Sequence, residues 1–335
     1  MTEKIRNFLN AEQIHQKAKV IDGHCDTIIN IINKKIDFGI KNSKGHLDIP
    51  RLREGGVDIQ VFAIYVEDIY KPNNALKRTL QMYDIFIQEI ENQQRQLSLI
   101  TDYDQIEKIE KQHKIGAILS IEGGESLEGD LGVLRVLYQL GFRLITLTWN
   151  HRNQIADGVG EARTNGGLTE FGVKVVGEMN RLGMLIDVSH LSEKGFWDVI
   201  QTSKHSVIAS HSNAYALCPH PRNLKDEQVK ALSDRGGVVG VTFVPNFLTN
   251  EGKNATIEDV LNHIDHFVEV GGINCVGIGS DFDGTRYLPY HLDGADKMSN
   301  ITAGLVKRGY KETDILKILG GNFLRVFREI MKKTD

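Results

Sequence analysis

The sequence predicts an α/β protein in which eight parallel strands and their crossover helices close into a (β/α)8 barrel of the TIM type. Short β-branched runs alternate along the chain with longer segments of helical period, which is typical of repeated βα units. Several of the runs are apolar throughout, as expected of strands buried on both faces. The length of 335 residues is close to that of one such barrel with a few insertions, so we expect a single domain over residues 1–335.

The predicted strands are eight runs spread over most of the chain. They span residues 19–26, 58–66, 116–123, 142–150, 184–190, 206–211, 237–244 and 275–282, and the predicted outer helices include 74–94, 170–183, 258–272 and 313–333. Eight such strands could also form an open sheet, but no Gly-rich dinucleotide fingerprint follows the first strand, which favours the barrel. The stretch 153–169 is rich in Gly, Asn and Asp, and we expect it to form a loop over the site.

Composition excludes several classes of partner. The net charge is -4 with both signs interspersed, so a basic surface for nucleic acid is not expected. No apolar run reaches about 18 residues, and the N-terminus lacks the apolar stretch of a secretory signal, so we expect no membrane association. The three cysteines, Cys25, Cys218 and Cys275, form no CxxC pair. These features predict a cytoplasmic protein.

Polar side chains interrupt the predicted strands at their C-terminal ends, where burial is costly without a partner. They are His24 and Asp26 in the first strand, Glu122 in the third, His190 in the fifth, His211 in the sixth and Asp281 in the eighth. His24 and Asp26 are two residues apart, so a strand directs both to the same side. In a (β/α)8 barrel all these ends meet at one rim, where active sites are built.

Three histidines and three carboxylates at one rim suit a pair of zinc ions, because zinc accepts both imidazole and carboxylate. A plausible division gives His24 and Asp26 to one ion and His190 and His211 to the other, with Glu122 bridging them. Two ions about 3.5–4 Å apart could share a water whose pKa falls toward about 7, which would supply hydroxide at neutral pH. Asp281 is then free to transfer protons. The pattern predicts a metal-dependent hydrolase.

The same residues lie in segments that resemble the membrane dipeptidase (renal dipeptidase) family of zinc peptidases, in the amidohydrolase-like superfamily. The segments are IDGHCDT (21–27), SIEGGES (120–126), NGGLTEFG (165–172), DVSHLS (187–192), ASHSN (209–213), HPRNL (220–224) and GSDFDG (279–284), in the order of the family. The resemblance implies a dizinc dipeptidase, acting through metal-bound hydroxide and including L–D dipeptides among its substrates.

The resemblance also assigns roles to individual residues. It implies that Glu122 bridges the zinc ions and that Asp281 orients the attacking water and passes its proton to the leaving amine. His151 matches the family histidine that contacts the substrate and the developing oxyanion, and Arg222 matches the arginine near the substrate carboxylate. The family also implies a homodimer. Val244 stands where some members carry a tyrosine, so a hydroxyl contact to the substrate would be missing.

Other interpretations of the sequence stay open. The same site could cleave another small amide, an N-acyl amino acid, a lactam or a phosphoester, and a barrel that has lost catalysis could serve as a binding or structural protein. Among other polar residues, His263 and His266 are expected on a solvated helix face. The acidic cluster Glu125, Glu128 and Asp130 is expected to open a helix and interact with its dipole.

Overall fold

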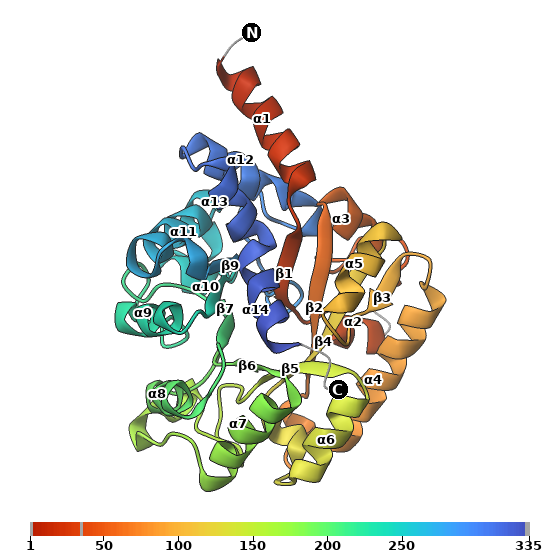
Figure 1. Cartoon of the computed structure of the whole chain (residues 1–335), viewed down its shortest axis with the longest axis vertical. Helices are drawn as coiled ribbons and strands as arrows, with labels where there is room; N and C mark the ends of the chain where they lie inside the picture. Colours follow the sequence, from red (N-terminus) through yellow and green to blue (C-terminus); the bar gives the residue numbers. More distant parts are fainter. Residues whose placement is uncertain (1–2, 34–35, 332–335) are drawn as a thin grey trace.

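Parallel strands close into a barrel in this protein. The computed structural model describes residues 3–33 and 36–331. In these residues nine strands follow the order β2-β1-β9-β8-β7-β6-β5-β4-β3, and β2 also pairs with β4, so the sheet closes on itself with β3 outside the ring (Figure 1). Along the chain, helices connect each strand to the next and pack on the outside of the barrel. The predicted (β/α)8 barrel is confirmed.

Each of the eight barrel strands overlaps one of the eight predicted runs. The strands are β1 Val20–Cys25, β2 Val57–Tyr65, β3 Leu97–Leu99, β4 Ile115–Glu122, β5 Phe142–Thr146, β6 Leu185–Asp187, β7 Ile208–Ser212, β8 Val238–Val241 and β9 Val276–Ile278. The short β3, which was not predicted, pairs in parallel with the start of β4. Its three residues are too few to show an alternating or continuous apolar pattern.

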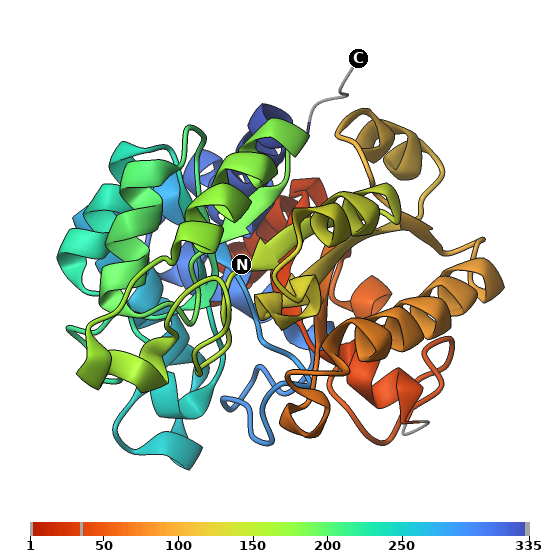
Figure 2. The same ribbon diagram turned by 90° about the horizontal axis from the view of Figure 1, so that it is seen from below.

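The helices surround the barrel, and Figure 2 shows the orange α4 on the opposite side of the strands from the cyan helices of the C-terminal half. Their bounds are α1 Glu3–Lys17, α2 Thr27–Ile32, α3 Ile49–Glu54, α4 Ala75–Asn92, α5 Asp104–Lys111, α6 Leu131–Gln139, α7 Glu170–Leu182, α8 Glu193–Thr202, α9 Asp226–Asp234, α10 Pro245–Leu248, α11 Ile257–Gly271, α12 Ser299–Lys307, α13 Glu312–Leu316 and α14 Asn322–Ile330. None of these described helices is long and apolar enough to cross a membrane.

The last predicted helix, 313–333, is interrupted in the structure. A π-helical turn, Lys317–Gly321, separates α13 from α14. Within it a Cβ on Gly320 would clash with the carbonyl oxygen of Lys19, because the turn packs against the start of β1. Close approach of two backbones therefore breaks the helix, and residues 332 and 333 lie outside the described part.

Two layers of apolar side chains hold the barrel together. Inside it, Ile21, Ile118 and their neighbours on other strands pack against Phe323 and Phe327 of α14, which lies across one end of the barrel (Figure 1). Truncating a fully buried phenylalanine such as Phe323 to alanine would cost about 3–5 kcal/mol. This layer fills the barrel below the level of the polar rim.

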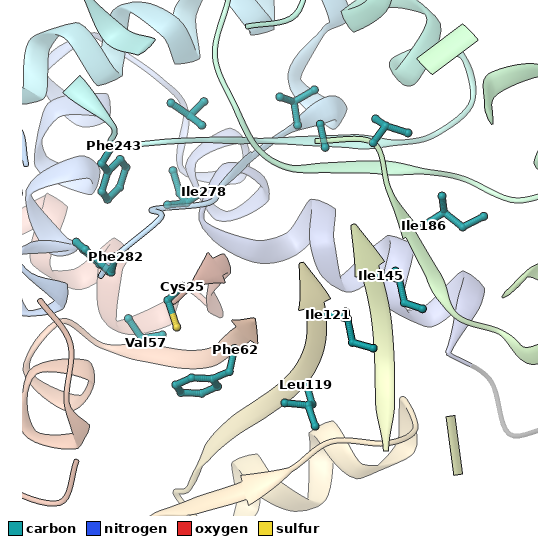
Figure 3. Packing of buried hydrophobic residues seen from close by; sticks show 14 of the residues in the cluster. Cys25, Val57, Phe62, Leu119, Ile121, Ile145, Ile186, Phe243, Ile278 and Phe282 are labelled. Carbon is teal, nitrogen blue, oxygen red and sulfur yellow. The ribbon is translucent and has the colours of Figure 1, made fainter. Parts of the chain in front are cut away.

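The second layer lies between the strands and the outer helices. Figure 3 shows Cys25, Leu119, Ile121 and Ile145 in this layer, next to other strand residues. Because side chains alternate along a strand, the residues between these point into the barrel. Cys25 thus packs outward as a buried thiol, whereas its neighbour His24 faces the interior.

Several strands end earlier than predicted at the polar rim. β6 ends at Asp187 and β9 at Ile278, so His190 and Asp281 lie in turns beyond the strands. Both residues have a positive φ, +66° for His190 and +63° for Asp281, which a strand does not allow. The predicted ends of 184–190 and 275–282 were wrong for this reason, although both side chains still lie at the rim.

Candidate metal centre

The five predicted metal ligands converge at the C-terminal end of the barrel. His24 lies in β1 and Asp26 directly follows that strand, Glu122 ends β4, His190 follows β6, and His211 lies in β7. All five side chains are buried. Four separate strands thus bring together residues that are up to 187 positions apart in the sequence, from His24 to His211.

The carboxylate of Glu122 lies between two pairs of possible ligands. Its Oε2 atom is 3.8 Å from Nε2 of His24, which in turn lies 3.6 Å from Oδ2 of Asp26. Its Oε1 atom is 3.0 Å from Nε2 of His190 and 3.5 Å from Nε2 of His211. Each oxygen of one carboxylate therefore faces one of the two pairs that the sequence suggested.

The unpaired polar atoms of this cluster fit a bound cation. Both ring nitrogens of His24 and Oδ1 of Asp26 are buried without a hydrogen-bond partner among the described residues. The Nε2 atoms of His190 and His211 lie 2.8 Å apart, so one ion could contact both. Leaving such groups unpaired is costly, whereas imidazole nitrogens and carboxylate oxygens are the ligands that zinc accepts. The donor set therefore fits metal ions.

The electrostatics of the cluster also favour cations. Burial lowers the pKa of His24, but the carboxylates of Glu122 and Asp26 outweigh burial and raise this pKa to about 10. Burial lowers the pKa of His190 to about 4 and holds the pKa of His211 well below its ordinary value. His190 and His211 are thus neutral at pH 7, which is the form that binds metal.

Two of the histidines are oriented by further side chains that the sequence did not single out. Nδ1 of His190 lies 2.8 Å from Oδ1 of Asn150. Nδ1 of His211 lies 2.7 Å from Oγ of Ser210, which donates to Oδ2 of Asp187 at 2.6 Å. Hydrogen bonds of this kind fix the ring of a metal-binding histidine and direct its other nitrogen to the ion.

The signal for Asp187 was present in the sequence. It is a carboxylate at the end of an apolar strand, and the argument from the cost of burial applied to it as well. In the structure it is fully buried and accepts four hydrogen bonds, from the backbone of Ser189, from the backbone and hydroxyl of Ser210 and from the hydroxyl of Thr146. These donors satisfy the carboxylate without a metal.

Asp281 lies beside the first pair of ligands. Oxygen and nitrogen atoms of His24, Asp26 and Asp281 form a group whose members all lie within 4.8 Å of one another. The backbone N–H of Asp281 donates to the carbonyl of His24 at 3.2 Å. Burial raises the pKa of its carboxyl group, with opposition from His24. A raised pKa is what a group that accepts and returns a proton near neutral pH needs.

The structure places Arg222 and His151 differently with respect to the cluster. Arg222 is buried beside it, and one terminal nitrogen donates to the carbonyl of His211 at 2.9 Å, while Nε has no partner in the described chain. His151 is exposed on the loop after β5, and its ring lies 5.8 Å from that of Trp149. Trp149 in turn lies 6.1 Å from the ring of His190. His151 is thus at the periphery of the cluster.

A tyrosine that the sequence analysis did not single out also lies at this rim. Tyr65 is the last residue of β2 and pairs with Glu122 in the register of the sheet. Burial raises the pKa of its hydroxyl group, and nearby carboxylates, among them Glu122, add to this effect. The hydroxyl therefore stays protonated. Val244, which the resemblance led us to expect at the place of a family tyrosine, is half-buried just before α10.

The acidic cluster near Glu122 follows the prediction in part, since Glu125 lies in the first turn of a 3-10 helix, Gly124–Leu127. Asp130 does cap α6, where its side chain accepts from the backbone N–H of Gly132. Glu125, however, is buried and lies 3.5 Å from the ammonium group of Lys71. The Lys71 ammonium also lies 4.9 Å from the ring centre of Tyr65. Glu125 is therefore part of a buried ion pair close to the rim.

The loop 153–169 contacts the site, as predicted. It contains a 3-10 helix, Val159–Thr164, and the backbone N–H of Val159 donates to the carbonyl of His190 at 2.8 Å. Further along the chain, the hydroxyl of Ser192 caps α8 and also donates to the carbonyl of Gly166 in the loop. The loop is thus fixed to the turn that carries His190.

Comparison with known proteins identifies the family. A family model described as membrane dipeptidase (peptidase family M19) matches residues 9–335. The chain belongs to the membrane dipeptidase family. The predicted resemblance is therefore confirmed. As a member of this family, the chain is a metal-dependent dipeptidase.

Solved structures agree with this family in fold and extent. The structure of a metallo peptidase named dipeptidase AC is 29% identical, with a TM-score of 0.89 over 94% of this chain and 99% of that chain. A metallo peptidase from Rhodobacter sphaeroides, solved with a phosphinate mimic of the dipeptide L-Ala-D-Ala, is 28% identical, with a TM-score of 0.88 over 93% and 99%. An amidohydrolase from Pseudomonas aeruginosa is 26% identical, with a TM-score of 0.83 over 96% and 99%.

Proposed function

We propose that this member of the membrane dipeptidase family is a dizinc enzyme that hydrolyses dipeptides, including L–D dipeptides. The observation that carries the proposal is the position of Glu122, whose two carboxylate oxygens face His24 with Asp26 on one side and His190 with His211 on the other. One carboxylate between two ligand pairs suits a bridging ligand in a two-metal site.

The roles of the protein groups follow from their places in the site. Two zinc ions held there would polarise the scissile carbonyl and a water molecule. Asp281, with its raised carboxyl pKa, would take the proton of that water and return it to the leaving amine. The guanidinium of Arg222 would bind the C-terminal carboxylate of the substrate, because its Nε lacks a partner among the described residues.

His151 lies beside Trp149 at the periphery of the site. We propose that it approaches the site when a dipeptide binds, since it lies on an exposed loop that can adjust its side chain. Its part would be to contact the substrate and stabilise the oxyanion. The hydroxyl of Tyr65, which ends β2 at the same rim, is the group available to replace the contact that Val244 cannot make.

A relative supports the inclusion of L–D dipeptides among the substrates. The Rhodobacter sphaeroides metallo peptidase, 28% identical, was solved with a phosphinate mimic of L-Ala-D-Ala. We extend that class of ligand to this chain because the two proteins share one fold over nearly their whole lengths. The departure at Val244 favours a second candidate, an N-acyl amino acid or another small amide, because one contact that distinguishes dipeptides is absent.

Metal analysis combined with a substrate panel tests the proposal. We expect about two zinc ions per chain and release of amino acids from L–D dipeptides, with slower turnover of N-acetyl amino acids, lactams and phosphoesters. Protein that holds two zinc ions but cleaves no dipeptide would refute the substrate. Protein that binds no zinc would refute the site and revive a non-catalytic barrel. Sedimentation analysis of the same sample tests the proposed homodimer.

A further inference from the structure

The carboxylate of Asp283 connects three segments next to the metal centre. Its side chain is almost fully buried, with 1% exposure. The hydroxyl of Thr27 donates to Oδ2 at 2.7 Å, and the backbone N–H of His46 donates to Oδ1 at 2.7 Å. In return, the backbone N–H of Asp283 donates to Nδ1 of His46 at 3.0 Å. None of these residues belongs to the proposed ligand set.

Each end of this network adjoins a residue of the centre. Thr27 directly follows Asp26 and begins α2, while Asp283 lies two residues after Asp281 in the turn beyond β9. His46 comes from the segment between α2 and α3, and its ring also lies 6.2 Å from that of Phe282 in the turn after β9. Burial lowers the pKa of the His46 ring, and because its Nδ1 accepts from the backbone N–H of Asp283, the neutral ring carries its proton on Nε2.

The turn that carries Asp281 is held in an unusual conformation. Asp281 has a φ of +63° and Asp283 a φ of +68°, a region that aspartate and asparagine tolerate better than most side chains. A Cβ on Gly284 would clash with carboxylate oxygens of both Asp26 and Asp281. The backbone of the turn therefore packs directly against two carboxylates of the site, and a shift of the turn would move both.

We propose that Asp283 is a positioning residue: through Thr27 and His46 it fixes the turn that sets the distance between Asp26 and Asp281. Hydrogen bonds that orient metal ligands typically change metal affinity or activity about 10–100-fold when they are lost. The inference rests on the proposed function, because it assigns Asp26 to a zinc ion and Asp281 to proton transfer.

Substitution of Thr27 tests the network without changing its charge. Thr27→Val keeps the shape of the side chain but removes the hydroxyl, whereas Thr27→Ser keeps the hydroxyl. We expect Thr27→Val to weaken the binding of one of the two zinc ions about tenfold and to lower kcat about tenfold with KM nearly unchanged. Thr27→Ser should recover both to within about twofold of the wild type. Competition with a chromophoric chelator measures zinc binding, and dipeptide hydrolysis gives kcat and KM.

Asp283→Asn provides the second variant, because asparagine tolerates the positive φ at this position. Its carboxamide offers one acceptor in place of two, and we expect effects in the same direction as for Thr27→Val. The matched control is Asp37→Asn, since Asp37 is exposed and its side chain accepts a hydrogen bond from the backbone N–H of nearby Gly39. The control should leave zinc binding and kcat unchanged.

The readouts separate this inference from the proposed function. If Thr27→Val and Asp283→Asn lower the melting temperature but leave zinc affinity and kcat per folded molecule within about twofold of the wild type, Asp283 is structural and the inference is overturned. If the wild type binds zinc but hydrolyses no dipeptide, the proposed substrate fails, and zinc affinity alone still decides the role of Asp283.

Discussion

The Nδ1 atom of His211 lies 2.7 Å from the hydroxyl oxygen of Ser210, and this contact sets which ring nitrogen carries the proton. Ser210 uses its own proton to donate to Asp187 at 2.6 Å, so its oxygen must accept from Nδ1–H of His211. The remaining nitrogen, Nε2, is then unprotonated and directed toward Glu122. The chain from Asp187 through Ser210 thus prepares His211 as a metal ligand.

Ser210→Ala should weaken zinc binding. The substitution removes the acceptor of Nδ1–H in His211 and one donor to Asp187, and we expect the zinc dissociation constant to rise about tenfold. The free energy of unfolding of the metal-free protein should fall by only about 1 kcal/mol. Chelator competition and chemical denaturation measure the two quantities.

Ser212→Ala is the matched control for this change. Ser212 is buried in the same strand, β7, and its hydroxyl has no partner in the described part of the chain. Its removal should leave zinc affinity unchanged. Equal losses in both variants would show that Ser210 acts through packing and not through the ring of His211.

Asp281→Asn should abolish turnover while the metals stay bound. Asparagine has nearly the same shape and tolerates the φ of +63°, but it cannot accept a proton. General acid–base groups contribute about 10²–10⁴-fold to rate, so we expect kcat to fall within this range. Zinc content per chain and dipeptide hydrolysis measure the effect, with the exposed Asp293→Asn as control. Loss of a zinc ion in Asp281→Asn would make Asp281 a ligand instead.

The fold and the centre of the site could be predicted because each depends on local signals. A buried strand is a run of apolar residues, and a polar residue at its end has to find a partner, so His24, Glu122 and His211 could be named from the sequence. Ser210 and Asn150 could not, because a serine or asparagine next to a strand end is common. Their role depends on distances between strands that only the folded chain defines.

The prediction for His263 was wrong, although its position on the helix could have corrected it. His263 was expected on a solvated face of α11, but its side chain is 1% exposed. It lies three residues after Val260 and four before Phe267, both buried, and therefore on the apolar face of the helix. Asp265, two residues further along, lies on another face of the helix, so helical spacing is a better guide than adjacency.

Arg222→Lys should raise KM more than it lowers kcat. Lysine keeps the charge but cannot bind a carboxylate through two nitrogens, and we expect KM for a dipeptide to rise about tenfold, or about 1.4 kcal/mol. Steady-state kinetics with a dipeptide and with the corresponding dipeptide amide measure the effect, and the amide should show little change. The exposed Arg286→Lys is the control. A fall in kcat with unchanged KM would contradict the role in carboxylate binding.

His263 should make the protein less stable in acid. Its Nδ1 atom accepts from the backbone N–H of Ala214 at 3.0 Å, and its Nε2 atom donates to the carbonyl of Leu248 at 2.9 Å. Burial lowers the pKa of its ring from 6.5 to about 4. Between these pH values the unfolded chain binds a proton that the folded chain does not bind. The contribution of His263 is therefore fully present above pH 6.5 and is lost as the pH falls toward 4.

His263→Gln should remove this pH dependence and keep the structure. A glutamine amide can accept from Ala214 and donate to Leu248, but it does not titrate. We expect the free energy of unfolding of the wild type, relative to the variant, to fall by up to about 1.4 kcal/mol per pH unit between pH 6.5 and 4. Denaturant titrations at several pH values, with both proteins free of metal, measure the difference. The exposed His205→Gln is the control, and parallel stability curves for the wild type and His263→Gln would show that the His263 ring titrates equally in both states.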